Sequence, residues 1–294
     1  MATPQNPTSK LRELIARPGR PLLLAGAPNA LTARIIEDTG FEAVYLSGAG
    51  IANTYLGAPD IGLLTMPEIV GHISATRDAV TLPIVVDGDT GFGNALGMQR
   101  TIRMFERAGA SGIQIEDQLA PKRCGHFSGK AVITADEMVG KVKAAADARD
   151  DDDFLIIART DSRAELGLDA ACDRVARYLD AGADVAFVEA PQSLAELRAI
   201  PAKVKGAHMA NMVEGGLTPI TPLNELGEFG FNIVLYANTA MRSAIVGMQF
   251  ALSGLLATGD SLGLGDRIAS WAERQRLVRK PEFDRLDARY GNGK

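Results

Sequence analysis

Residues 116 to 126 bring several reactive side chain types together. A thiol, Cys124, follows two cations, Lys122 and Arg123, and His126 stands two positions further on. Positive neighbours lower the pKa of a thiol, so Cys124 is expected to exchange a proton near neutral pH. Just upstream, Glu116 ends an apolar run and supplies a carboxylate that is suited to a hard cation. The segment predicts an enzyme that uses a metal and a proton-donating thiol on an anionic substrate.

A second acidic motif, Asp87-Gly88-Asp89, follows the apolar run Ile84–Val86. Residues two apart on an extended chain point the same way, and two facing carboxylates repel unless a cation or proton lies between them. A glycine-rich turn capped by aspartates is the alternative reading. Oxygen ligands favour Mg²⁺, or Mn²⁺, over zinc. The candidate ligands are Asp60, Asp87, Asp89 and Glu116.

Each remaining candidate has a plainer explanation beside the functional one. Cys124 is either a reactive thiol or a buried structural one, and with His126 it forms an isolated Cys-x-His pair that also occurs in zinc sites. Arg159 ends the apolar run 154–158 and is either a clamp for a substrate carboxylate or the partner of a nearby aspartate.

The composition excludes several classes of partner. A net charge of −5 argues against nucleic acid and anionic membranes. Two cysteines in 294 residues do not make a disulfide framework, which favours a reducing cytoplasm. No apolar run of about 20 residues is free of polar interruption, because Asn238, Arg242 and Gln249 break the longest, so no membrane span is expected.

Short apolar runs alternate with segments of helical period, which is typical of strands buried in a parallel sheet. Eight strands and eight helices predict a (β/α)₈ barrel of the TIM type; a doubly wound open sheet is the alternative fold. The expected strands are 21–26, 43–48, 83–89, 112–117, 154–161, 185–190, 207–212 and 231–236. The expected helices are 30–39, 66–80, 95–108, 134–149, 168–181, 193–200, 222–228 and 239–257.

Polar residues gather where the expected strands end. In a barrel these ends meet at one mouth, where active sites form. Besides the acidic residues above, they include Tyr45, Ser47, Gly48, Arg159, Glu189, Asn211 and Glu214.

The pattern changes beyond residue 258. Glycines between 259 and 265 indicate a connector, 266–278 reads as an amphipathic helix ended by Pro281, and 283–290 as a last short helix. We therefore expect a catalytic barrel over 1–258 and a helical extension over 259–294 that packs on its own barrel or on a neighbouring subunit.

These motifs resemble the isocitrate lyase and phosphoenolpyruvate mutase superfamily, in order, over about residues 10–290. The similarity is carried by 47–50, 56–60, 87–93, 116–118, 122–126, 158–161 and 211–216. The Lys-Arg-Cys-Gly-His motif is specific to the carbon–carbon lyase branch, and the sequence is most similar to its methylisocitrate lyase and 2,3-dimethylmalate lyase group. Ala49 and the absence of a proline after Tyr236 depart from the pattern of methylisocitrate lyases.

The resemblance implies a role for each candidate. Asp87 would ligate Mg²⁺, with Asp60, Asp89 and Glu116 holding its waters. Cys124 would be the general acid on a loop that closes, with Lys122 and His126 beside it, and Tyr45 a candidate base. Ser47, Gly48 and Arg159 would hold the 2-oxo acid portion, and Glu189, Asn211 and Glu214, with His126, the second carboxylate.

The resemblance also implies a homotetramer, a dimer of dimers whose C-terminal helices are exchanged between subunits. The implied activity is Mg²⁺-dependent cleavage of a 2-hydroxydicarboxylate to a 2-oxo acid and a carboxylate. Three alternatives stay open: oxaloacetate hydrolysis, phosphonate chemistry by a mutase or a phosphonopyruvate hydrolase, and an inactive barrel that serves as a binding subunit.

Overall fold

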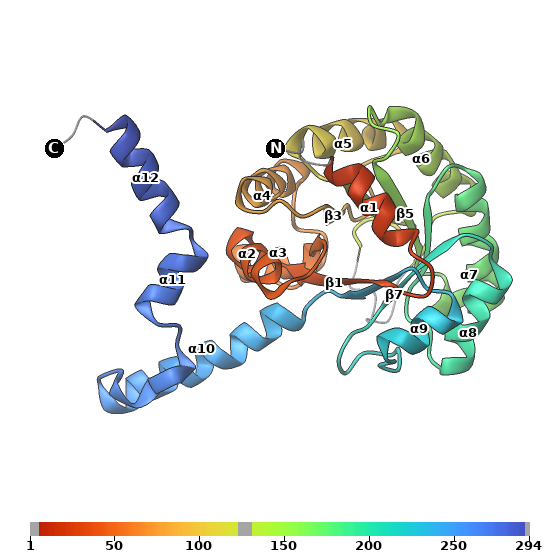
Figure 1. Ribbon diagram of the computed structural model, residues 1–294. Helices are drawn as coiled ribbons and strands as arrows, with labels where there is room; N and C mark the ends of the chain where they lie inside the picture. Colours follow the sequence, from red (N-terminus) through yellow and green to blue (C-terminus); the bar gives the residue numbers. More distant parts are fainter. Residues whose placement is uncertain (1–5, 123–130, 292–294) are drawn as a thin grey trace.

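Eight parallel strands form a closed barrel in the computed structural model, which describes residues 6–122 and 131–291 (Figure 1). Neighbours in sequence are neighbours in the sheet, and β8 closes the barrel on β1 with Leu24 opposite Leu235. The expected barrel is confirmed, and the open sheet is excluded. The strands are β1 Leu22–Ala27, β2 Val44–Leu46, β3 Ile84–Asp87, β4 Gly112–Glu116, β5 Leu155–Thr160, β6 Val185–Val188, β7 Ala207–Asn211 and β8 Ile233–Tyr236.

The predicted helices follow their strands, with bounds shifted by a few residues. They are α2 Ala30–Thr39, α4 Met66–Ala79, α5 Ala95–Ala108, α6 Ala135–Ala148, α7 Arg163–Asp180, α8 Leu194–Lys203, α9 Leu223–Phe229 and α10 Thr239–Thr258. Local chemistry fixes several ends: Asn29 and Thr134 accept hydrogen bonds from the first turns of α2 and α6. Gly40 ends α2 with φ 98°, a left-handed conformation that favours glycine.

Two apolar layers surround the strands. The inner layer fills the barrel and includes Leu24, Val85, Ile157, Phe187 and Met209. The outer layer packs helices on strands and is centred on α4 to α7. Side chains alternate along a strand, so every second one points into the barrel. These inward side chains are apolar along most of the barrel and polar at the carboxyl ends of the strands.

Helix α1, Pro7–Ile15, was not expected and lies across the amino-terminal end of the barrel (Figure 1). Asn6 caps it by accepting from the Thr8 backbone N–H at 3.2 Å. Leu11 and Leu14 are buried in the inner layer, and Arg12 binds Asp184 at 2.9 Å. The helix therefore closes the end of the barrel opposite the expected active site.

Further short elements follow β2 and α10. After β2 the chain forms α3, Gly48–Ile51, and a π-helical turn, Ala52–Leu56. After α10 it forms a 3₁₀ turn, Leu262–Arg267, then α11, Trp271–Leu277, and α12, Lys280–Tyr290. The helix predicted over 266–278 is therefore wrong in its first part, and Pro281 begins α12 rather than ending α11.

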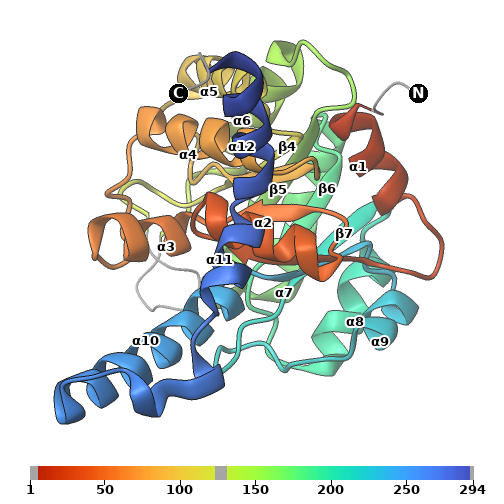
Figure 2. The same ribbon diagram turned by 60° about the vertical axis from the view of Figure 1, so that its left-hand side comes forward.

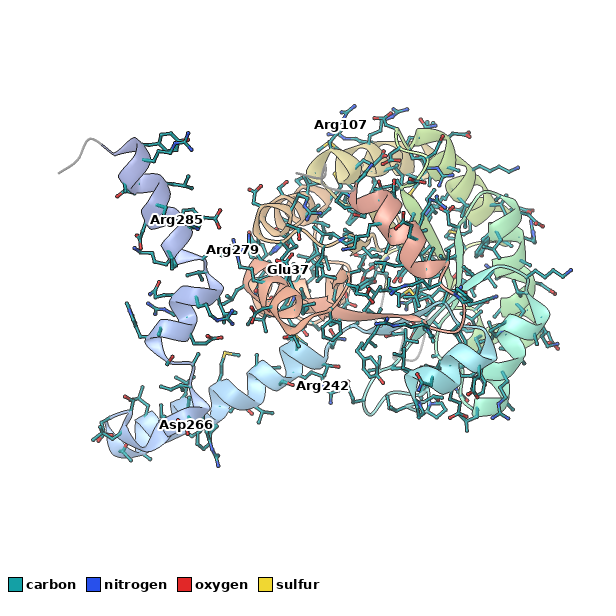
Figure 3. The ribbon with its side chains drawn as sticks, viewed as in Figure 1. Glu37, Arg107, Arg242, Asp266, Arg279 and Arg285 are labelled. Atoms are coloured by element: carbon teal, nitrogen blue, oxygen red, sulfur yellow. The ribbon has the colours of Figure 1, made fainter. Side chains whose placement is uncertain are left out.

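The C-terminal helices leave the barrel as an arm (Figures 1 and 2). Helix α10 starts at the barrel mouth but projects outward, and only Met241 in it is buried. Helix α11 returns alongside α2, where Arg276 pairs with Asp38 at 2.6 Å. Arg279, directly before α12, pairs with Glu37 at 3.1 Å (Figure 3). The arm thus departs from the barrel at α10, earlier in the chain than the predicted boundary after residue 258.

Candidate active site

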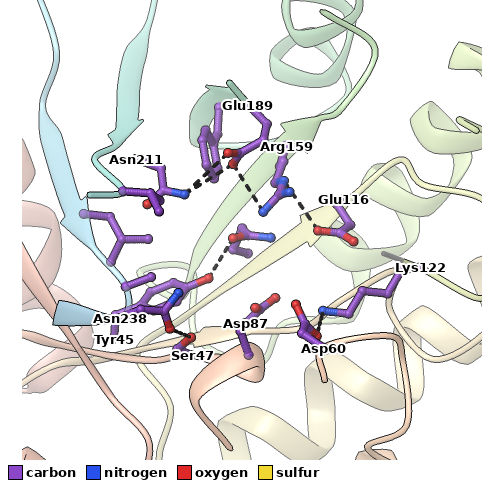
Figure 4. Close-up of a pocket in the computed structure, with 16 residues that line it drawn as sticks. Tyr45, Ser47, Asp60, Asp87, Glu116, Lys122, Arg159, Glu189, Asn211 and Asn238 are labelled. Carbon is purple, nitrogen blue, oxygen red and sulfur yellow. Dashed lines mark hydrogen bonds and ion pairs between the residues drawn. The ribbon is translucent and has the colours of Figure 1, made fainter. Parts of the chain in front are cut away.

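A polar cavity opens at the carboxyl ends of the strands (Figure 4). Seven of the eight strands, all but β1, contribute a lining side chain, either from the strand itself or from the segment directly after it. The lining comprises Tyr45, Ser47, Ala49, Asp60, Asp87, Gln114, Glu116, Lys122, Arg159, Phe187, Glu189, Asn211, Val213, Leu235, Ala237 and Asn238. Most of the predicted site residues therefore meet at one place, as the barrel requires.

Asp87, the last residue of β3, points into this cavity. Its oxygens accept the backbone N–H groups of Gly48 and Asp89, each at 3.2 Å. Within residues 6–122 and 131–291, no Lys, Arg or His forms an ion pair with it. A Cβ atom on Gly48 would lie 3.0 Å from Asp87 Oδ2, so glycine allows this close approach of backbone to carboxylate.

Lys122 also lines the cavity and is 5% exposed. Its Nζ contacts Asp60 at 2.5 Å and Asp89 at 2.7 Å. Burial alone would lower the pKa of Lys122, but the charges of Asp89, Asp87 and other carboxylates outweigh it and raise that pKa well above its usual value. Lys122 is therefore a fixed cation that holds two of the predicted metal-site carboxylates together.

Arg159, on β5, lies among three carboxylates. Its Nε and Nη2 each donate to Asp161 at 2.9 Å, while Nη1 faces Glu189 at 3.3 Å. Its Nε is also 3.4 Å from Glu116. The bidentate side of the guanidinium thus binds a neighbouring aspartate, as the plainer explanation predicted, and Nη1 is the part directed toward Glu189 across the cavity (Figure 4).

The acidic groups of the site are not balanced by these two cations. Burial, with the charges of Asp87 and Asp60, raises the pKa of Asp89 to about 7 despite its contact with Lys122. Burial and the charge of Asp161 likewise raise the pKa of Glu116 well above its usual value. The site therefore favours an additional positive charge.

A divalent cation fits this donor set. Glu116 Oε1 is buried with no hydrogen-bond partner in the described chain, and Asp87 has no cation beside it there. Among the residues described, no three Asp, Glu, His or Cys side chains converge closely enough to form a metal cage. Mg²⁺ is commonly bound through one or two carboxylates and keeps several waters, so a full protein cage is not required for it.

Tyr45 and Asn211 both line the cavity (Figure 4). Burial, and then the charge of Asp87, raises the pKa of Tyr45 well above its usual value, which keeps the phenol protonated at neutral pH. Asn211 Nδ2 lies 3.5 Å from both oxygens of Glu189. Ser47 donates to Asn238 at 3.4 Å and its Oγ accepts the Gly50 backbone N–H.

Some predicted residues do not meet at the cavity. Glu214 is outside its lining, because its carboxylate bonds to Thr239 at 2.5 Å and to Arg242 at 3.3 Å at the start of α10. Cys124 and His126 lie outside the described residues, so their roles stay predictions. Asp117, next to Glu116, points away from the barrel interior and bonds to Tyr178 at 2.8 Å.

Gln114 is the main lining residue that the sequence analysis missed. It lies on β4 two residues before Glu116, so strand alternation places both on the inner face. Its polar side chain between Ile113 and Ile115 was the available signal.

Comparison with known proteins places this geometry in a family. The phosphoenolpyruvate phosphomutase family model matches residues 11–256. The 2,3-dimethylmalate lyase of Eubacterium barkeri is 39% identical over 98% of this chain and all of its own length. A 2-methylisocitrate lyase of Aeropyrum pernix is 40% identical over 97% of this chain and 91% of its own.

Other relatives have different names. A carboxyvinyl-carboxyphosphonate phosphorylmutase of Arabidopsis thaliana is 41% identical, covering 98% of this chain and 87% of its own. The structure of an oxaloacetate acetylhydrolase bound to 3,3-difluorooxalacetate superposes with a TM-score of 0.92 at 29% identity, covering 98% of each chain. The chain thus belongs to the phosphoenolpyruvate phosphomutase family, in the phosphoenolpyruvate mutase and isocitrate lyase superfamily, and is an enzyme of its lyase group.

Proposed function

We propose that this lyase is Mg²⁺-dependent and cleaves a substituted malate, of the 2,3-dimethylmalate or 2-methylisocitrate type, to a 2-oxo acid and a carboxylate. The observation that carries the proposal is the cavity itself, in which Asp87, a carboxylate that forms no ion pair with a described side chain, lines the same space as the cations Lys122 and Arg159. The names of the two similar lyases support the substrate class.

The residues of the cavity would have different roles, according to where they lie. Asp87 would hold the cation, and Asp60, Asp89 and Glu116 would bind its waters. When bound, Mg²⁺ supplies positive charge that lowers the pKa of a substrate hydroxyl. Arg159 Nη1 and the polar groups around Ser47 and Gly48 would hold the 2-oxo acid half, and Glu189 with Asn211 the other half.

The reaction needs one proton removed and one delivered. Loss of the substrate's 2-hydroxyl proton lets a C=O bond form at C2 as the C2–C3 bond breaks. The bonding electrons pass to C3 and into the adjacent carboxylate. A proton donor must then quench this carbanion, and Cys124 is predicted to be that acid. The hydroxyl proton and the delivered proton balance, so no oxidant or second substrate is required.

Oxaloacetate hydrolysis is the second candidate. It is supported by the close similarity to the structure of the oxaloacetate acetylhydrolase bound to the inhibitor 3,3-difluorooxalacetate. Water would add to the 2-oxo group before the same bond breaks, and the products would be oxalate and acetate. Phosphonate chemistry is disfavoured by the cysteine motif of the lyase branch, and an inactive barrel by the polar groups retained in the cavity.

We also propose that the substrate is a small dicarboxylate, that the enzyme works in the cytoplasm as a homotetramer, and that neither nucleic acid nor membrane is a partner. By length and composition alone, α10 is the one helix in the described chain that could span a membrane, and only 6% of its apolar stretch is buried. Contact with a second copy of the chain would cover the exposed apolar side chains of α10.

A product assay tests the activity. Purified enzyme with Mg²⁺ is given a panel of 2-hydroxy- and 2-oxo-dicarboxylates, and both products are identified. Pyruvate with a branched or substituted carboxylate supports the lyase, and oxalate with acetate supports the hydrolase. Phosphate released from phosphonopyruvate, or no turnover of any compound, would overturn both.

A further inference from the structure

Gln114 is a buried amide on β4 that lines the polar cavity. It is 1% exposed, and its register partners in the neighbouring strands are Asp87 and Ile157. Burying an amide costs free energy unless its polar atoms are hydrogen-bonded. A glutamine at this place therefore needs a partner for both its oxygen and its nitrogen.

Among the described residues, 6–122 and 131–291, only the oxygen of that amide has a hydrogen-bond partner. The hydroxyl of Tyr45 donates to Gln114 Oε1 at 2.7 Å, a bond between two buried side chains on β2 and β4. Gln114 Nε2 is buried and has no hydrogen-bond partner in the described chain. Both residues line the cavity that contains Asp87 and Arg159.

This bond also fixes what Tyr45 offers to a ligand. A phenol has one proton to donate and lone pairs that accept. Since the proton is directed to Gln114, the oxygen is left as an acceptor. An amide oxygen is not a base at neutral pH, so Gln114 does not take this proton away.

We propose that Gln114 is a substrate-positioning and specificity-determining residue, an inference that rests on the function proposed above. Its Nε2 donates to an oxygen of the dicarboxylate, and its Oε1 orients Tyr45 so that the phenol oxygen accepts the substrate's 2-hydroxyl proton in a hydrogen bond. The pair thus selects substrates that carry a hydroxyl on the carbon to be cleaved. Tyr45 acts as a neutral acceptor, not as the base.

Gln114→Met tests the pair, because methionine keeps the length of the side chain but has neither the donor nor the acceptor. We expect kcat/KM for the best hydroxy-dicarboxylate to fall about 10–100-fold, mostly through a higher KM. A buried polar group left without a hydrogen-bond partner weakens binding by about this factor. Gln114→Glu keeps the acceptor for Tyr45 but replaces the donor by a charge, and should weaken substrate binding at least as much.

A double-mutant cycle separates positioning from packing. Tyr45→Phe and Gln114→Met should each reduce kcat/KM. The kcat/KM of the double variant should be no more than about 3-fold below that of the less active single variant, because the two groups act as a unit. Met209→Leu is the matched control: it repacks the same inner layer, lies outside the cavity lining, and should keep wild-type KM.

Each outcome has a distinct meaning. If the wild-type enzyme cleaves no compound of the panel, the proposed function fails. If it cleaves a hydroxy-dicarboxylate but Gln114→Met and Gln114→Glu stay within about 3-fold of it, or if the losses in the double variant multiply, Gln114 does not position the substrate. Thermal unfolding of every variant shows whether a loss follows from misfolding; should Gln114→Met not fold, Gln114→Glu decides.

Discussion

At the scale of single residues, the site is a problem of charge balance. Lys122 forms ion pairs with Asp60 and Asp89. Arg159 forms ion pairs with Glu116, Asp161 and Glu189. Asp87 is left without a cation among the described side chains. Asp87 is therefore the residue whose loss should change cation binding most directly.

Asp87→Asn keeps the shape of the side chain but removes its charge. We expect Mg²⁺ binding, measured by calorimetry in the presence of oxalate, to weaken at least 10-fold and turnover to be lost, because a neutral amide is a poor ligand for a hard cation. Asp260→Asn, an exposed aspartate beyond α10, is the control and should change neither. An active Asp87→Asn enzyme would place the cation elsewhere.

Cys124 is predicted to deliver the proton that ends the reaction. Cys124→Ser should lower kcat by about 10²–10⁴-fold, the usual contribution of a positioned acid, because a serine hydroxyl is much less acidic than a thiol. Mg²⁺–oxalate binding should persist. Cys172→Ser is a matched control, since that thiol is buried in α7 and is not part of the cavity lining. Near-normal turnover of Cys124→Ser would refute the acid role.

His208 should make stability depend on pH. Its ring is buried, Nε2 contacts the Val204 carbonyl at 2.8 Å, and Nδ1 has no partner in the described chain. Burial lowers the pKa of His208 below its usual 6.5. The unfolded chain then binds more protons than the native one just below pH 6.5, so the free energy of unfolding falls as the pH drops through that value.

His208→Asn would test this by denaturant unfolding between pH 7.5 and 5. The variant should be less stable overall but lose less stability on acidification than the wild type. Equal pH slopes in the two proteins would show that His208 titrates alike in both states.

At the scale of elements, α1 closes the barrel. Leu11 is fully buried in the inner apolar layer, so Leu11→Ala leaves a cavity as well as losing apolar contact. We expect the free energy of unfolding to drop by about 2–5 kcal/mol. Leu31→Ala on α2, where the side chain is 48% exposed, should cost much less. Equal losses in urea unfolding would mean that α1 does not pack on the barrel in solution.

Strand positions could be predicted because buried parallel strands are continuous apolar runs, as in Ile84–Val86. The gathering of Asp87, Glu116 and Arg159 then follows from barrel geometry alone. Helix α1 was missed because it precedes β1 and so lies before the strand–helix alternation from which the other helices were predicted. The partnership of Lys122 with Asp60 and Asp89 could not be predicted, because it depends on where three loops, after β2, β3 and β4, meet.

The direction of α10 could not be predicted from the sequence either. Its apolar side chains are spread around the helix, so the same pattern suits a helix that covers its own barrel and one that covers a neighbour. Glu214 shows the same limit, since its position near the motif residues did not reveal that Thr239 and Arg242 would bind it.

At the scale of the whole molecule, the arm presents more apolar surface than a solvated helix needs. Val246 is 66% exposed, Leu252 63% and Leu256 90%, and Trp271 on α11 is 71% exposed. Contiguous exposed apolar side chains of this kind mark contact surfaces. The ion pairs of Arg276 and Arg279 with α2 hold the arm in place, so it is a formed surface. A second copy of the chain that carries the same arm would cover it.

We therefore expect a homotetramer that forms as a dimer of dimers. Val246→Glu combined with Leu252→Glu places two charges on α10, and burying them at an interface is unfavourable, so light scattering after size exclusion should show smaller species than the wild type. Leu96→Glu, which changes a 76% exposed leucine on α5, is the matched control and should leave the mass unchanged. Circular dichroism checks that each variant is folded. A wild-type monomer, or a tetramer in the double variant, would show that α10 does not form the interface.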